Sequence, residues 1–121
     1  MEAAKVHLSD SVILRPAGRI DLSNADLFKE VLLEAVAAAK AAVILDLSAI
    51  EYVSSAGLRS LIIASKAAAA RGVRVGVAAL QPIVGEIFTI SRFHLVVPRF
   101  ETVREAVGKL DPSALGGFDA L

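Results

Sequence analysis

Asp46-Leu-Ser-Ala-Ile-Glu-Tyr-Val-Ser-Ser-Ala-Gly-Leu-Arg59 connects an apolar strand to a helix through a polar turn. The turn puts the hydroxyls of Ser54 and Ser55 at the start of that helix. A helix N-terminus carries unpaired backbone N–H groups and the positive end of the helix dipole. A serine there can cap the helix, contact an anion or carry a phosphate. Which of these the serines do decides the function of the protein.

Expected strands lie on both sides of this turn. Apolar runs at 6–8 and 12–14, separated by a polar Ser-Asp-Ser cluster, predict a hairpin. The nearly continuous apolar run 43–47 is typical of a strand that is buried on both faces, and 73–80 predicts another strand. A last short strand is expected at 95–97.

Helices are expected between and after these strands. The first follows an N-cap predicted at Ser23, with Asp26 in its first turn. One face of that helix is expected to carry Leu27, Val31, Ala35 and Ala38. The second begins at the serine turn and ends near Gly72, the third runs from Pro82 to about Ser91, and the fourth covers 102–110. The sequence therefore predicts an α/β fold: a mixed, mostly parallel sheet of about five strands with about four helices packed on it.

The 121 residues suffice for one domain with a single core. Residues 1–110 are expected to form it, and the turn-rich residues 111–121 are expected to be a flexible tail. Because 55% of the residues are hydrophobic but only 5% aromatic, the core must consist mostly of alanine, valine, leucine and isoleucine.

Charge and composition exclude several classes of partner. Thirteen basic and thirteen acidic residues give a net charge of zero, so neither nucleic acid nor an anionic membrane surface is expected to bind. No cysteine and only two histidines are present, so no metal site is expected. The N-terminus lacks an apolar signal core and no segment is long enough to insert directly into a membrane, so a cytoplasmic location is expected.

Enzymatic interpretations of the turn have little support. The glycine patterns of phosphate-binding loops do not occur, so no nucleotide or other cofactor is expected. A serine hydrolase would need a histidine beside Ser54 or Ser55. Only His7 and His94 exist, both lie beside apolar strand residues, and each is expected to be structural.

Purely structural interpretations remain open. Serine is among the commonest helix caps, so either hydroxyl of the turn can serve the helix alone. Gly57 can allow close backbone packing where the helix leaves the strand. Asp46 can hydrogen-bond the backbone at the strand end, which is favoured because no partner for general-base chemistry can be named.

The turn and its surroundings resemble a known family. The signature of STAS domains, the fold of bacterial anti-sigma factor antagonists, resembles three consecutive parts of this stretch: Asp46-Leu-Ser48, the spacer to Val53, and Ser-Ser-Ala-Gly-Leu58. Gly18-Arg-Ile-Asp21 resembles the segment before the first helix of that family, and Phe100-Glu-Thr-Val-Arg-Glu-Ala-Val107 resembles its closing helix. The resemblance covers about residues 6–110.

The resemblance implies a binding module and not an enzyme. Its partner would be a serine-kinase anti-sigma factor with a histidine-kinase-like ATPase fold. The unphosphorylated antagonist would sequester the kinase and free the sigma factor, and phosphorylation by the same kinase would dissolve the complex. A serine phosphatase would be a further partner.

One residue departs from the family pattern Asp-Ser-Ser/Thr-Gly, in which the phosphate acceptor immediately precedes glycine. Ala56 stands at that position and cannot be phosphorylated. The acceptor is therefore expected to be Ser55, which is nearer the helix start, with Ser54 as the second choice. The expected partner-binding residues are Asp21, Ser54, Ser55, Ala56, Gly57, Leu58 and Arg59, of which Leu58 can equally face the core.

A phosphoserine at this turn would leave the fold intact but change binding. It adds about 1.5 to 2 negative charges, which a helix N-terminus favours by about 0.3–1 kcal/mol. In a closely packed interface the same dianion would cost several kcal/mol of desolvation and repulsion. Two other functions stay open: an accessory subunit of a membrane lipid-transport complex without a phosphorylation switch, which Ala56 favours, and, with least support, a serine hydrolase.

Overall fold

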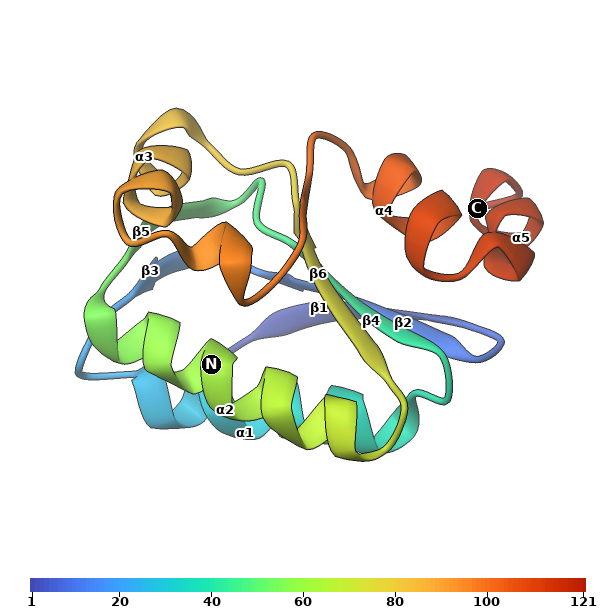
Figure 1. Cartoon of the computed structure of the whole chain (residues 1–121), viewed down its shortest axis with the longest axis horizontal. Coiled ribbons are helices and arrows are strands. Elements are labelled where there is room, and N and C mark those ends of the chain that lie inside the picture. Colours follow the sequence, from blue (N-terminus) through green and yellow to red (C-terminus); the bar gives the residue numbers. More distant parts are fainter.

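The computed structural model describes residues 1–121 (Figure 1). Its strands are β1 (Ala3–Leu8), β2 (Ser11–Pro16), β3 (Gly18–Ile20), β4 (Ala42–Asp46), β5 (Ile50–Val53), β6 (Arg74–Ala78) and β7 (Arg99–Phe100). Its α-helices are α1 (Ala25–Ala38), α2 (Ser55–Ala70), α3 (Pro82–Ile90), α4 (Val103–Leu110) and α5 (Leu115–Asp119). Two 3₁₀ turns, η1 (Phe93–Leu95) and η2 (Pro112–Ala114), complete the chain.

The strands form a mixed α/β architecture, as the sequence predicts. The main sheet has the order β1-β2-β4-β6-β7, and only the β1–β2 hairpin is antiparallel. The unpredicted strands β3 and β5 form a small parallel sheet of their own. They continue the paths of β2 and β4, from which only short breaks separate them, and at three and four residues they are too short to give a clear periodic signal.

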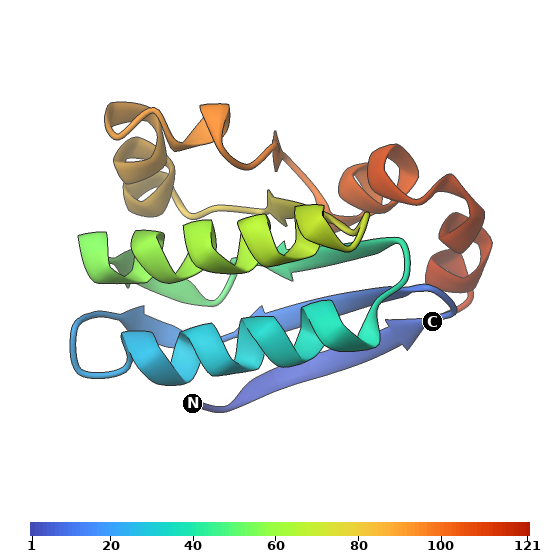
Figure 2. The ribbon, with the colours of Figure 1, turned by 60° about the horizontal axis from the view of Figure 1, so that its bottom comes forward.

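The helices cover the two faces of the main sheet unequally. α1 and α2 lie side by side along one face (Figure 2), and the larger part of the core lies beneath them. α4 and α5 lie on the opposite face, over a smaller apolar cluster. α3 packs against β5, at the end of the molecule opposite α5 (Figure 1). The amino end of α2, where the serine turn lies, is thus at the α3 end.

The buried face of α1 differs from the predicted one. The structure buries Ala25, Phe28, Leu32, Ala35 and Val36. Of the four residues assigned to one face from the sequence, only Ala35 is fully buried, while Leu27 is 47% exposed and Ala38 is exposed. Since this helix is apolar on more than one side, its composition supports two overlapping stripes, and packing against the sheet selects the one that contains Phe28.

The predicted strand at 95–97 is wrong. Leu95 ends η1, and β7 begins only at Arg99. Val97 is fully buried in an irregular segment, and such burial accounts for the apolar run that resembled a strand. Pro98 has no N–H to donate to the sheet. It pairs with β6 only through its carbonyl, which accepts a hydrogen bond from the amide of Val77 at 3.0 Å.

The last residues are folded in the structure, in contrast to the predicted flexible tail. They form η2 and α5, which pack on α4 and the sheet. The buried Asp111 carboxylate accepts hydrogen bonds from Ser11 Oγ at 2.6 Å and from Ser113 Oγ at 2.7 Å. Asp119 also binds Arg104 through two hydrogen bonds of 3.0 Å. The Ser11–Asp111 bond joins residues 100 positions apart, so no local pattern announces it.

Replacing Asp111 by alanine should destabilise the protein by about 1–3 kcal/mol, because the buried Ser11 hydroxyl loses its acceptor. Asp119→Ala is the matched control and should cost less than about 1 kcal/mol, since its ion pair with Arg104 is exposed to solvent. Urea denaturation of the three proteins measures both effects. Equal losses in the two variants would contradict the role of Asp111.

Candidate functional site: the serine turn at the start of α2

Parallel pairing of β3 with β5 brings two distant loops together. Ile20 lies opposite Val53, and both strands end there, so Asp21 and Ser54 leave the small sheet side by side. The amide of Ser54 donates to the carbonyl of Ile20 at 2.8 Å. The structure therefore places the loop of Asp21 directly beside the serine turn.

Ser54 is the N-cap of α2. Its backbone is extended (φ −82°, ψ 171°), and its Oγ accepts a hydrogen bond from the amide of Gly57 at 3.2 Å. The side chain is half-buried. The capping interpretation of the turn is thus confirmed for Ser54, whose hydroxyl oxygen is engaged in holding the helix start.

Ser55 differs from its neighbour in every one of these respects. It is the first residue of α2, it is exposed, and its hydroxyl makes no hydrogen bond within the chain. The backbone amides of Ser55 and Ala56 likewise have no acceptor in the chain, as is usual for a first helical turn. The exposed hydroxyl therefore lies beside free amide donors and the positive end of the α2 dipole.

Gly57 and Leu58 belong to the packing of the turn. A Cβ on Gly57 would lie 2.7 Å from Ile20 Cγ2 and 2.9 Å from Val53 Cγ1, so close backbone packing is confirmed as the reason for glycine here. Leu58 is only 9% exposed and faces the core. The structure thus shows the buried one of the two orientations predicted for Leu58. The next residue, Arg59, is exposed and follows Ser55 by one helical turn.

Asp21 is held in a compact hydrogen-bonded loop. Its carboxylate accepts from Ser23 Oγ and from the Ser23 amide at 3.0 Å, while its own amide donates to Asn24 Oδ1 at 2.9 Å. These bonds from Ser23, the hydroxyl first, lower the pKa of Asp21 below its ordinary value. The predicted N-cap at Ser23 is wrong, because Asn24 holds that position and the Ser23 hydroxyl serves Asp21 instead.

The side chains of Asp46, His7 and His94 make no hydrogen bond with Ser54 or Ser55. Asp46 Oδ1 accepts from the amide of Ser48 at 3.0 Å, which confirms the backbone role expected at the strand end. His7 and His94 are exposed and not structural, contrary to expectation. His7 pairs with Val12, which pairs with the first residues of β4, so it lies at the far end of the sheet from Ser54.

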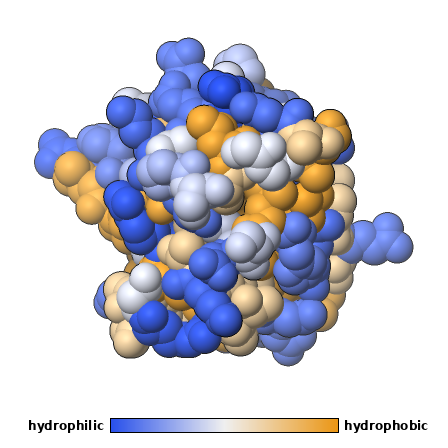
Figure 3. Space-filling view, turned by 90° about the vertical axis from the view of Figure 1, so that its right-hand side faces the viewer, coloured by the Kyte–Doolittle hydropathy of each residue, from blue (hydrophilic) through white to orange (hydrophobic).

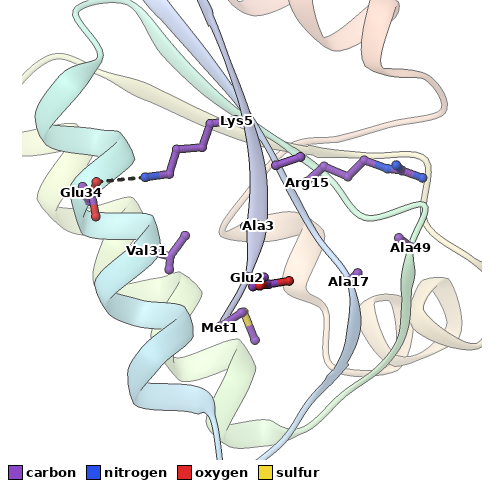
Figure 4. A pocket seen from close by; sticks show the side chains of 10 residues that line it. Met1, Glu2, Ala3, Lys5, Arg15, Ala17, Val31, Glu34 and Ala49 are labelled. Carbon is purple, nitrogen blue, oxygen red and sulfur yellow. Dashed lines mark hydrogen bonds and ion pairs between the residues drawn. The ribbon is translucent and has the colours of Figure 1, made fainter.

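A small groove borders the serine turn. It has a volume of about 170 Å³ and is lined by Leu22, Ala25, Asp26, Lys29, Ala56, Arg59, Ser60 and Ile63. Leu22 is 85% exposed and was not singled out from the sequence, because nothing in a local pattern separates an exposed leucine from a buried one. A larger opening, about 650 Å³, surrounds the amino end of β1 (Figure 4). It extends from α1, where Lys5 pairs with Glu34 at 2.9 Å, to Arg15, Ala17 and Ala49 on the other side of β1.

The histidine, aspartate and glutamate residues form no group of three or more that could hold a metal ion. None of the helices combines the length and the hydrophobicity that a membrane-spanning helix needs.

The STAS domain family model matches residues 2–106. The chain belongs to the STAS domain family. Solved structures with the same fold include one described as an anti-sigma factor antagonist from Thermotoga maritima (TM-score 0.81, 21% identity, covering 89% of this chain and 93% of that chain). An anti-sigma factor antagonist from Mycobacterium paratuberculosis is similar (TM-score 0.81, 21% identity, covering 90% of this chain and 92% of that chain). A sulfate transporter family protein from Wolinella succinogenes is also similar (TM-score 0.74, 16% identity, covering 89% of this chain and 90% of that chain).

The two serines of this STAS domain should respond differently to truncation. Ser54→Ala should destabilise the fold by about 0.5–2 kcal/mol, because α2 loses its cap. Ser55→Ala should change stability by less than about 0.5 kcal/mol, because its hydroxyl makes no bond. Chemical denaturation tests this, and a larger loss from Ser55→Ala than from Ser54→Ala would reverse the assignment.

The Asp21 loop predicts a pH effect. Because the pKa of Asp21 is lowered in the folded state, its hydrogen bonds stabilise the fold above the ordinary value of 3.8, and this contribution is lost as the pH falls through the lowered pKa. Ser23→Ala should move the pKa of Asp21 back up toward 3.8, since the largest cause of the shift is removed. An NMR titration of the Asp21 carboxyl carbon in the wild type and in the variant measures this. An unchanged pKa in the variant would refute the role of Ser23.

Proposed function

We propose that this STAS domain is an anti-sigma factor antagonist that acts by partner switching in the cytoplasm. Its unphosphorylated form binds a serine-kinase anti-sigma factor and releases the sigma factor. Phosphorylation at the serine turn reverses this binding, and a serine phosphatase restores it. The observation that carries the proposal is the difference between the two serines: Ser54 caps α2, whereas the Ser55 hydroxyl is exposed and unbonded at the same helix start.

The surroundings of Ser55 suit a phosphate. The free backbone N–H groups of the first turn of α2 and the positive end of the helix dipole lie together at the N-terminus of the helix, beside Ser55. Arg59 follows Ser55 by four residues, so both lie on one exposed face of α2, where a guanidinium can pair with a phosphate. A phosphoryl group on Ser55 is therefore compatible with the fold.

The same group would disturb a bound partner. The expected contact surface consists of the exposed or half-buried side chains of Asp21, Ser54, Ser55, Ala56 and Arg59, with Leu22 beside them. A dianion in the middle of this surface would have to be desolvated on binding, and it would repel acidic groups of the partner. The domain thus works as the substrate of a kinase and not as an enzyme.

A second function is favoured by Ala56, which occupies the position of the family's usual acceptor. Under this alternative the domain is a constitutive accessory subunit of a membrane lipid-transport complex, bound through the same surface without a phosphoryl cycle. The likeness of its fold to a sulfate transporter family protein is compatible with this alternative.

Binding measurements on two variants distinguish the functions. Purified serine-kinase anti-sigma factors from the host serve as the partners, each tested by calorimetry against wild-type, Ser55→Ala and Ser55→Asp protein. Ser55→Ala should bind like wild type, and Ser55→Asp should weaken binding about 100-fold or more, which corresponds to about 3 kcal/mol. The same kinase and ATP should phosphorylate wild type but not Ser55→Ala.

Ser9→Asp controls for the added charge. Ser9 lies in the exposed β1–β2 turn, away from α2, with a positive φ of 54° that aspartate tolerates. This variant should bind like wild type. If Ser55→Asp also binds like wild type to a partner that the domain demonstrably binds, the switch is refuted and the constitutive subunit is favoured.

A further inference from the structure

The face of the sheet opposite α1 and α2 is only partly covered. Along β1, β2 and β4 its side chains form three rows: Leu8, Ser11 and Ala42; then Val6, Ile13 and Ile44; then Ala4, Arg15 and Asp46. The first row lies under η2 and α5, since Ser11 binds Asp111 and Leu8 lies close to Gly117. α4 covers the β4 and β6 side, where Gly76 touches Leu110. The corner at Ala4, Val6 and Arg15 stays open.

This corner is a cavity of about 240 Å³. Its apolar walls are Ala4, Val6, Ile13, Val103, Phe118 and Leu121. Val6, Val103 and Phe118 are half-buried, so their apolar surface remains available to a small molecule. Figure 3 views the molecule from the α5 end and shows hydrophobic surface between the polar side chains on that side. This volume is below the about 300–1,000 Å³ typical of sites for drug-sized ligands, so the cavity suits a smaller molecule.

Two charged side chains, Arg15 and Asp46, line the rim of the cavity. Arg15 points away from α1, on the opposite side of the sheet from Lys5 (Figure 4). Its Nε lies 3.4 Å from Ser48 Oγ and 3.7 Å from Asp46 Oδ2, while its two terminal nitrogens make no hydrogen bond in the chain. Asp46 is itself held by the Ser48 amide. The guanidinium therefore keeps a pair of donors for an anion in the geometry that suits a carboxylate.

We propose that this corner binds a small monoanionic amphiphile, a molecule with an apolar chain of about seven carbon atoms and a single carboxylate. The apolar body lies against Val6, Ile13, Val103 and Phe118. The carboxylate binds the terminal nitrogens of Arg15. This site lies apart from the serine turn, and the proposal does not depend on the function assigned to that turn.

Octanoate is the probe, added to the full-length protein below its micellar concentration and followed by two-dimensional NMR. The shifts should saturate and concentrate on the residues that line the cavity. Arg15→Met keeps the apolar stem and should weaken binding at least tenfold. Ala4→Phe fills the cavity from an exposed position on β1 and should abolish the saturable shifts.

Ala69→Phe is the matched control, because Ala69 is also exposed but lies in α2, on the other face of the sheet, and lines neither opening. It should bind octanoate like wild type. Shifts that do not saturate, or that spread over the surface and persist in Ala4→Phe, would overturn the site. Undiminished affinity in Arg15→Met would overturn the assignment of an anionic ligand. Because the readout needs only purified protein and octanoate, failure here leaves the partner-switching experiment unaffected.

Discussion

The short parallel pairing between β3 and β5 is the constraint on which the rest of the site depends. It ends with Ile20 beside Val53, and the Ser54 amide then binds the carbonyl of Ile20. The start of α2 can lie so close to these strands only because Gly57 has no side chain. A pair of strands with three and four residues thus fixes where the serine turn lies and which loop lies beside it.

Because of this constraint, the adjacent hydroxyls of Ser54 and Ser55 have different roles. The sharp change from extended to helical backbone at Ser54 directs its oxygen toward the amide of Gly57. Ser55, one residue later, already has helical geometry, and its side chain points outward. A modification of the cap would compete with the helix for the same oxygen. A modification of Ser55 would leave every hydrogen bond of the turn in place, so binding can change while the fold persists.

Much of this arrangement could be predicted from the sequence, because it rests on local patterns. The apolar run 43–47, the serine turn and the glycine after α2 are each recognised from neighbouring residues. They sufficed to predict the mostly parallel sheet and the helix start. The cap at Ser54 and the packing role of Gly57 follow from the same few residues. The backbone role of Asp46 was likewise foreseeable, since its partner lies only two residues away.

What could not be predicted depends on contacts between distant residues. Ser23 has the pattern of a cap but binds Asp21, because the loop between β3 and α1 turns back on itself. The last residues looked frayed because α5 contains two glycines, yet Ser11 and Asp111 hold them across 100 positions. The apolar run at 95–97 resembled a strand because Val97 enters the core from an irregular segment.

Phosphopeptide mapping of the protein purified from its own host, in growth and under stress, tests the central claim most directly. The tryptic segment from Ala41 to Arg59 contains Ser48, Ser54 and Ser55. Partner switching at an exposed hydroxyl predicts a phosphoryl group on Ser55 whose occupancy changes with the condition. Absence of phosphate from this segment in every condition, or phosphate on Ser54 while Ser55 is never modified, would contradict it.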